Sequence, residues 1–365
     1  MTVTTAARVG RLPRDLHPLA WWVWALGLAT AASTTTNPFV LLLLVGVAAL
    51  VVAARRSDQP WGRSFRLYLW LGLVIIVVRV VFRLVFGGSY GDTVLLDLPE
   101  IPLPGWVRGI TLLGPVTLES LLAGLYDGMR LAAIVICVGA ANSLANPKRL
   151  LRSVPSALYE VGTALVVAVT VLPQLADSVR RVRAAQRLRA GDQRRFGRVR
   201  RTLVPVLEDA LERSLALAAG MDTRGYGRTS GASRGARRTT GALLLLGLCG
   251  LCIGCYAVLD TTAPRYLALP MVVLGLLLAG AGLRSAGRRA ERTTYRPDPW
   301  RWAETGVALS GIATGAACWW VGRESPLLAH PLLTEVPSVA GLALLGALAG
   351  LAAAVIAPPP RMVAA

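Results

Sequence analysis

The sequence predicts an all-α integral membrane protein with about eight transmembrane helices and a central cytoplasmic domain of long amphipathic helices. Hydrophobic residues make up 54% of the 365 residues, while the formal net charge is +19. The apolar residues stand in blocks of about 18 to 20, the length that crosses roughly 30 Å of hydrocarbon. The arginines stand between these blocks. The positive charge is therefore better explained by membrane topology than by nucleic-acid binding.

Eight apolar segments are long enough to be helical spans, and they set the order of the predicted elements. Arginines precede the first segment and no small-residue cleavage site follows it, which indicates a retained span instead of a signal peptide. The predicted spans cover residues 19–34, 39–54, 67–86, 118–141, 242–258, 267–283, 302–321 and 339–356.

Basic residues in the short loops predict the orientation of the spans, because arginine and lysine are retained on the cytoplasmic side during insertion. They cluster after the second, fourth and sixth spans, at residues 55–66, 148–152 and 284–292. The loop 87–117 carries Asp92, Asp97 and Glu100 and is predicted to face outside. Both termini of this multi-pass protein are therefore expected to be cytoplasmic.

The segment 159–175 interrupts this alternation. It is apolar, but basic clusters flank both of its ends, so it cannot cross the membrane once and keep both flanks inside. We expect a long helix along the cytoplasmic interface, kinked at Pro173. A second helix, 203–224, should follow, with Pro205 in its first turn, a stripe of leucines on one face and Gly225 just after its end.

These elements divide the chain into four predicted regions. They are an N-terminal transmembrane bundle at 1–143, a cytoplasmic or interfacial helical domain at 144–240, a transmembrane hairpin at 241–285 and a C-terminal extension with two spans at 286–365. The second region holds ten arginines between Arg180 and Arg201 but a single aromatic residue. Nucleic-acid sites usually interleave basic and aromatic residues, so we expect these arginines to meet the lipid bilayer and exclude a nucleic-acid partner.

Four ionisable residues fall inside predicted spans, where charge is costly and usually faces the interior of the bundle. Arg79 and Arg83 lie one turn apart in the third span, and Asp127 and Arg130 lie in the fourth. A substrate or ion path is one interpretation of these residues. Intramembrane ion pairs that stabilise the bundle are the interpretation we favour.

Three of the five cysteines have the C-x2-C-x2-C spacing of an iron–sulfur motif, at Cys249, Cys252 and Cys255. They lie inside a predicted span, and no fourth cysteine followed by proline accompanies them. Gly250 and Gly254 in the same segment instead form a small-xxx-small pattern that predicts close helix packing. We therefore expect neither a metal site nor a cofactor.

Two arginines are predicted to stand at the ends of the two long helices of the central domain. Arg189 lies in the sequence Leu188-Arg189-Ala190, and Arg224 lies in Thr223-Arg224-Gly225. Small residues beside a guanidinium let a partner surface approach, and its planar fork can bind carboxylates or helix-end carbonyls of a partner. Arg187 is the alternative to Arg189.

The sequence Met221-Asp222-Thr223-Arg224-Gly225-Tyr226-Gly227 resembles a motif of the T component of energy-coupling-factor transporters, the CbiQ-like transmembrane subunits of prokaryotic importers. Family members show two motifs with an arginine between small residues, each at the end of a cytoplasmic coupling helix. Leu188 departs from the small residue usual before the first arginine. Asp15-Leu16-His17-Pro18 is also similar to the family, as is the segment 124–131 running into Asn146-Pro147-Lys148-Arg149-Leu150-Leu151, so the resemblance covers about residues 10–285.

The resemblance implies a non-catalytic subunit in the prokaryotic cell membrane. Cytoplasmic ATPase subunits, either two copies or a heterodimer, would grip the coupling helices through Arg189 and Arg224. A separate S component in the membrane would capture a vitamin or a metal ion. The chain contains no Walker motif, so ATP hydrolysis is expected from the partners.

Two alternatives belong to other functional classes. A stand-alone permease would be favoured by polar residues repeated through several spans. A membrane-embedded lipid or prenyl transferase would need clustered acids that hold Mg²⁺ against a diphosphate. Glu208, Asp209 and Glu212 lie along one helix without such a pattern.

Overall fold

The structure is a computed structural model that describes residues 14–57, 62, 64–86, 91, 93–97, 99, 113–153, 159–188, 195–226, 234–260, 265–288 and 298–360. The chain forms two compact units. Unit 1 comprises Met1–Leu150 and Pro297–Ala365, and unit 2 comprises Leu151–Arg296. Residues of the predicted extension thus belong to the same unit as the N-terminal bundle.

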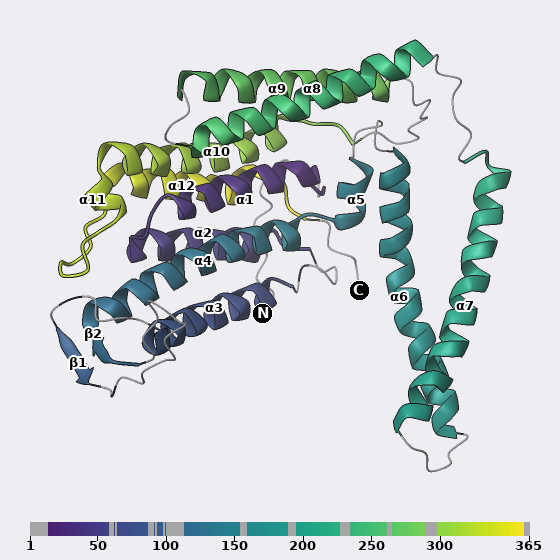
Figure 1. Cartoon of the computed structure of the whole chain (residues 1–365), viewed down its shortest axis with the longest axis horizontal. Helices are drawn as coiled ribbons and strands as arrows, with labels where there is room; N and C mark the ends of the chain where they lie inside the picture. Colours follow the sequence, from purple (N-terminus) through teal and green to yellow (C-terminus); the bar gives the residue numbers. More distant parts are fainter. Residues whose placement is uncertain are drawn as a thin grey trace, which may run out of the picture. The chain divides into compact units, whose positions relative to one another are not determined.

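Unit 1 is a bundle of helices that lie side by side (Figure 1). Side chains cap several of the helix starts: Asn37 accepts from the Phe39 amide, and Thr117 accepts from the Ser120 amide. The helices are α1 (Pro18–Ser33), α2 (Pro38–Arg55), α3 (Phe65–Phe86), α4 (Leu118–Leu144), α5 (Pro147–Arg152), α10 (Trp302–Glu324), α11 (Pro326–Ala329) and α12 (Gly341–Ile356).

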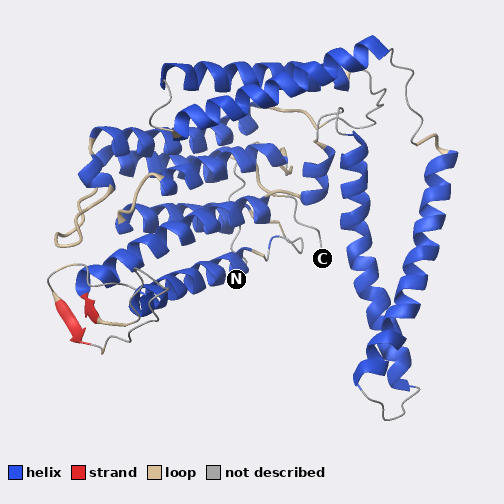
Figure 2. Ribbon diagram, viewed as in Figure 1, coloured by secondary structure: helices blue, strands red, loops and turns tan. Residues whose placement is uncertain are grey.

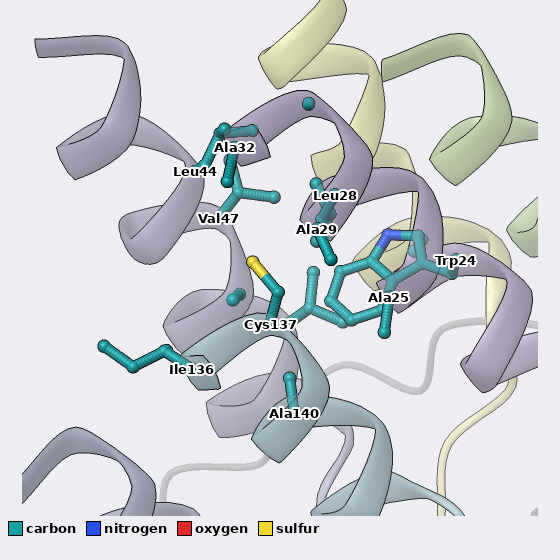
Figure 3. Packing of buried hydrophobic residues seen from close by; sticks show 14 of the residues in the cluster. Trp24, Ala25, Leu28, Ala29, Ala32, Leu44, Val47, Ile136, Cys137 and Ala140 are labelled. Atoms are coloured by element: carbon teal, nitrogen blue, oxygen red, sulfur yellow. The ribbon is translucent and has the colours of Figure 1, made fainter. Parts of the chain in front are cut away.

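The core of unit 1 lies where α1, α2 and α4 meet. Trp24 and Leu28 of α1, Leu44 of α2 and Cys137 of α4 are fully buried there, and Figure 3 shows their side chains converging from the three helices. Apolar surface buried inside a membrane bundle stabilises mainly through packing, because lipid is also apolar. Small residues such as Ala140 are therefore needed to bring the helices close.

The C-terminal helices pack closely against α1. A Cβ on Gly311 of α10 would lie 2.3 Å from the Trp24 Cα, and one on Gly27 would lie 2.1 Å from the Gly311 carbonyl oxygen. The Trp24 indole donates to the Gly350 carbonyl of α12 at 3.0 Å. Small residues at these positions thus let two backbones touch, as is typical of small-xxx-small contacts between membrane helices.

The loop between α3 and α4 contains a short antiparallel hairpin that the sequence did not reveal (Figure 2). Strand β1 (Val94–Asp97) pairs with β2 (Pro115–Thr117), with a register shift between Val94 and Leu96. The sequence between the two strands gave no short turn signal, so their pairing could not be read from local pattern. Asp92 and Glu100 lie outside the described residues.

Unit 2 contains α6 (Tyr159–Leu188), α7 (Arg195–Thr223), α8 (Arg234–Leu259) and α9 (Arg265–Gly287). Helices α8 and α9 form a close pair, in which Gly250 faces Gly275 and Gly254 faces Val272. This confirms the predicted glycine contact. The three cysteines of α8 are exposed and free, on faces turned away from these glycines.

Helices form at all eight predicted spans within the described residues. Five of the eight, and also residues Val161–Gln186 of α6, are long and apolar enough to cross a membrane. Of the other three, α1 and α12 have 16 residues each, and α10 has 23 residues but does not reach the same apolarity. By length and composition α6 therefore qualifies as a span. The basic residues at both of its ends remain the reason to place it along the interface.

The predicted start of α7 at residue 203 was wrong. The helix begins at Arg195, so Pro205 lies inside it and not in its first turn. Arginine is a good helix former, and an interior proline removes one hydrogen bond without forcing the helix to end. The arginine-rich sequence before Leu203 therefore continues the helix.

Candidate functional site

The Arg224 end of α7 is closed by a backbone motif. The Tyr226 amide donates to the Met221 carbonyl at 3.1 Å, and the Gly225 amide donates to the Asp222 carbonyl at 2.9 Å. These two bonds, from the second and first residues after the cap to the third-last and second-last residues of the helix, define a Schellman motif. Arg224 is thus the C-cap of a well-formed helix end.

Gly225 has a φ of +76°, in the left-handed region. A residue with a Cβ is strained in this conformation, which explains why glycine follows the arginine. The reversal ends the helix at once and directs the chain away from its axis. Thr223 and Arg224 are left exposed at the end of α7.

The surroundings of Arg224 leave its side chain accessible. Every residue from 211 to 220 is exposed, and the Thr223 hydroxyl is turned back to the Gly220 carbonyl at 3.0 Å. A guanidinium at such a place can donate to two carboxylate oxygens or to the free carbonyls of a partner helix. The Arg224 side chain is therefore an exposed cationic group at the end of a helix, where a partner protein can reach it.

The other predicted arginine site is described only in part. Leu188 is the last residue of α6 and is 89% exposed. Arg189 and Ala190 lie outside the described residues, as does the side chain of Arg187. The structure therefore places Leu188, Thr223, Arg224 and Gly225 but leaves the first arginine as a prediction.

Helices α6 and α7 are joined at a polar crossing that sequence reasoning missed. In Figure 1 the two helices cross in the part nearest the loop that connects them. The buried Ser178 hydroxyl of α6 donates to the Asp209 carboxylate of α7 at 2.6 Å, and Arg181 and Arg213 lie 3.5 and 3.1 Å from the same carboxylate. The hydrogen bond from Ser178, with help from Arg213 and Arg181, holds the pKa of Asp209 below its ordinary value.

The leucine stripe of α7 is exposed along its length. Leu203, Leu207, Leu211 and Leu215 are between 51% and 63% exposed, although the sequence pattern predicts a buried face. Val206, on another face, is buried near the crossing. The stripe is therefore an apolar surface next to the Arg224 end of the same helix.

The structure brings together two of the four ionisable residues predicted inside spans. Arg79 of α3 lies 3.7 Å from the Asp127 carboxylate of α4, and both side chains are about half exposed. Arg130 instead donates to the Ser33 carbonyl. Arg83 packs its Cβ against Gly124, and no carboxylate among the described residues lies within ion-pair distance of it.

Two comparisons with known proteins point in one direction. The CbiQ family model, described as cobalt transport protein, matches residues 10–233. The energy-coupling factor transporter transmembrane protein EcfT of Leuconostoc gelidum subsp. gasicomitatum is 27% identical over 198 residues, which are 49% of this chain and 67% of the relative. The family match includes the crossing of α6 and α7 and the Arg224 motif, and it ends before α8, α10 and α12.

Proposed function

This chain belongs to the CbiQ family and is a non-catalytic, multi-pass transmembrane component of an energy-coupling-factor transporter, and from this premise we propose that it couples cytoplasmic ATPases to a substrate-binding membrane subunit. The exposed Arg224, fixed by the Schellman motif at the end of α7, is the observation that carries the proposal. Arg189 would make the equivalent contact at the end of α6.

The physical basis of the contact is a charge presented on a rigid element. The arginine extends from a helix of 29 residues, so a displacement of its tip is carried along the helix. Bidentate hydrogen bonds to a carboxylate fix direction as well as distance. ATP-driven closure of the ATPases would then move α6 and α7 as a pair, because the contacts of Asp209 join them.

The membrane partner would use the apolar surface of α7. The leucine stripe has the width and spacing of a helix-packing face, and a membrane subunit with an apolar helix is its natural complement. The transported cargo would be a vitamin or a metal ion held by that subunit. Both termini of this chain would be cytoplasmic, on the same side as Arg224.

The test is co-purification in detergent with the ATPase subunits produced in the same cell. We expect Arg224→Ala and Arg189→Ala together to remove most ATPase binding while the protein still inserts in the membrane. Arg180→Ala is the matched control, because Arg180 is an exposed arginine in the middle of the polar half of α6. Binding that survives the double substitution would refute the coupling assignment.

A further inference from the structure

At one end of unit 1 a single arginine joins three segments that are distant in sequence. The Arg149 guanidinium binds the Asp298 carboxylate, with an Nε–Oδ2 distance of 3.0 Å, and its Nη1 lies 3.8 Å from the Asp15 carboxylate. Asp15 precedes α1, Arg149 lies in α5, and Asp298 precedes α10. Asp298 also lies beyond residue 233, where the family match ends.

The position of Arg149 is set by the capped first turn of the short helix α5. The Asn146 side chain accepts from the amides of Lys148 and Arg149 at 3.0 and 3.4 Å, and Pro147 occupies the first helical position. Helix α5 ends at Arg152, and α6 begins at Tyr159. Helix α5 is therefore the last helix of the chain before α6.

Asp298 is held by the packing of the residues that follow it. The Trp300 ring lies 5.4 Å from the buried His17 ring, and its indole donates to Thr305 at 2.9 Å. One turn further on, the fully buried Glu304 accepts from Arg14 at 2.8 Å. Pro299 also restricts the backbone of Asp298, so the conformations in which Asp298 can meet Arg149 are fewer.

We propose that Asp298 is a positioning residue for coupling. Together with Arg149 it holds α5 in place. A displacement of α6 would then also displace the transmembrane bundle, because α5 would not move independently of the bundle. The inference rests on the proposed function, because it needs α6 to be a coupling helix. It assigns to the C-terminal extension a part in transport that the family match does not cover.

The side chains of this cluster are accessible enough for a clean test. Arg149, Asp298 and Asp15 are 23%, 38% and 43% exposed, so removing one charge leaves no buried ion without a partner. Glu304 is unsuitable, since its own side chain is fully buried and its replacement would disturb the packing around it. Asp298→Asn keeps the size of the side chain and removes the charge that holds Arg149.

The test measures transport in the assembled complex in vesicles, as substrate taken up per ATP hydrolysed. We expect Asp298→Asn to lower this ratio about three-fold, within the range that a partly exposed ion pair can supply, with ATPase binding unchanged. Asp298→Glu should restore the ratio. Glu335→Gln, an exposed carboxylate of the same extension, is the matched control and should leave it unchanged.

A second measurement reads the position of α5 without any ATPase. Spin labels at Lys148 and Arg56, both exposed, are attached in a full-length chain whose native cysteines are replaced. We expect the distance distribution between them to broaden in Asp298→Asn and to narrow again in Asp298→Glu. The label distances can be measured even if Arg224 does not bind ATPases. Failure of the proposed function can therefore be distinguished from failure of the role proposed for Asp298.

Three results would overturn the proposal. One is an unchanged uptake ratio in Asp298→Asn, whatever the label distances. Another is loss of uptake in parallel with loss of ATPase binding, which would indicate general damage to the fold. The third is a lowered ratio with an unchanged label distribution, since the effect would then not pass through α5.

Discussion

At the scale of single residues, the backbone of Gly225 decides where Arg224 lies. Its φ of +76° costs a residue with a Cβ about 1–2 kcal/mol, which corresponds to a roughly 5- to 30-fold change in the population of the native helix end. We expect Gly225→Ala to weaken ATPase binding by a factor in this range, measured by titration of the ATPases onto the purified protein. Gly225→Asn should weaken it less, because asparagine tolerates this region.

Gly220 supplies the control for this prediction. It lies in the same helix, and a Cβ there would meet nothing within 4 Å. Gly220→Ala should leave binding unchanged and stabilise the helix slightly, by about 0.5–1 kcal/mol. Equal binding by the Gly225→Ala and Gly220→Ala variants would show that the helix end does not position the arginine.

The end of α7 could be predicted from the sequence because its signal is local. A glycine that follows a run of helix-forming residues indicates a helix end, and here Gly225 follows such a run and Arg224. In the structure α7 ends at Thr223. The hydrogen bonds of Arg130 and Asp209 could not be predicted in this way. Each depends on which side chain of another helix lies opposite, and that is set by how the helices cross.

At the scale of elements, the crossing of α6 and α7 should depend on pH. The pKa of Asp209 is lowered in the folded protein from the ordinary value of 3.8, so its bonds to Ser178, Arg213 and Arg181 favour the ionised form. A lowered pKa contributes stability that is present above the ordinary value and lost as the pH falls through the folded value. We expect the two helices to separate below about pH 4, measured by spin-label distances between α6 and α7.

Two variants separate this effect from general acid damage. Asp209→Asn should weaken the crossing at neutral pH and remove its dependence on acid. Glu212→Gln changes an exposed carboxylate one turn away on the same helix and should leave the pH profile as it is. A crossing that keeps the same acid transition without Asp209 would assign the titration to another group.

The elements of the membrane bundle were easier to predict than their boundaries in the central domain. Long apolar segments predict spans by composition alone, and every predicted span is helical. The start of α7 could not be predicted correctly, because helix signals in a polar sequence are weak and Pro205 is equally compatible with a first turn. The exposed leucine stripe shows the same limit, since amphipathic pattern predicts a face for packing but not the partner that covers it.

At the scale of the whole molecule, the extension is part of the bundle that carries the family sequence. Arg14 and Pro359 are joined by a backbone hydrogen bond of 3.2 Å, and Arg55 of α2 donates to the Ala354 carbonyl in the last turn of α12. An arginine at that place satisfies a carbonyl that the helix end leaves free. The glycine spacing of the last two helices is typical of close packing, but their contact with α1 is a long-range pairing that spacing cannot specify.

This packing makes Gly311 a position where unit 1 is sensitive to side-chain size. Leucine there would place its Cβ 2.3 Å from the Trp24 Cα, a backbone atom that cannot move without shifting α1. We expect Gly311→Leu to cost at least the upper end of the about 1–3 kcal/mol typical of overpacking, and to lower the melting temperature in detergent. Gly46→Leu is the control, because a Cβ on Gly46 of α2 meets nothing within 4 Å. If both variants melt like the native protein, α10 does not pack on α1, and the extension could not hold Asp298 beside Arg149.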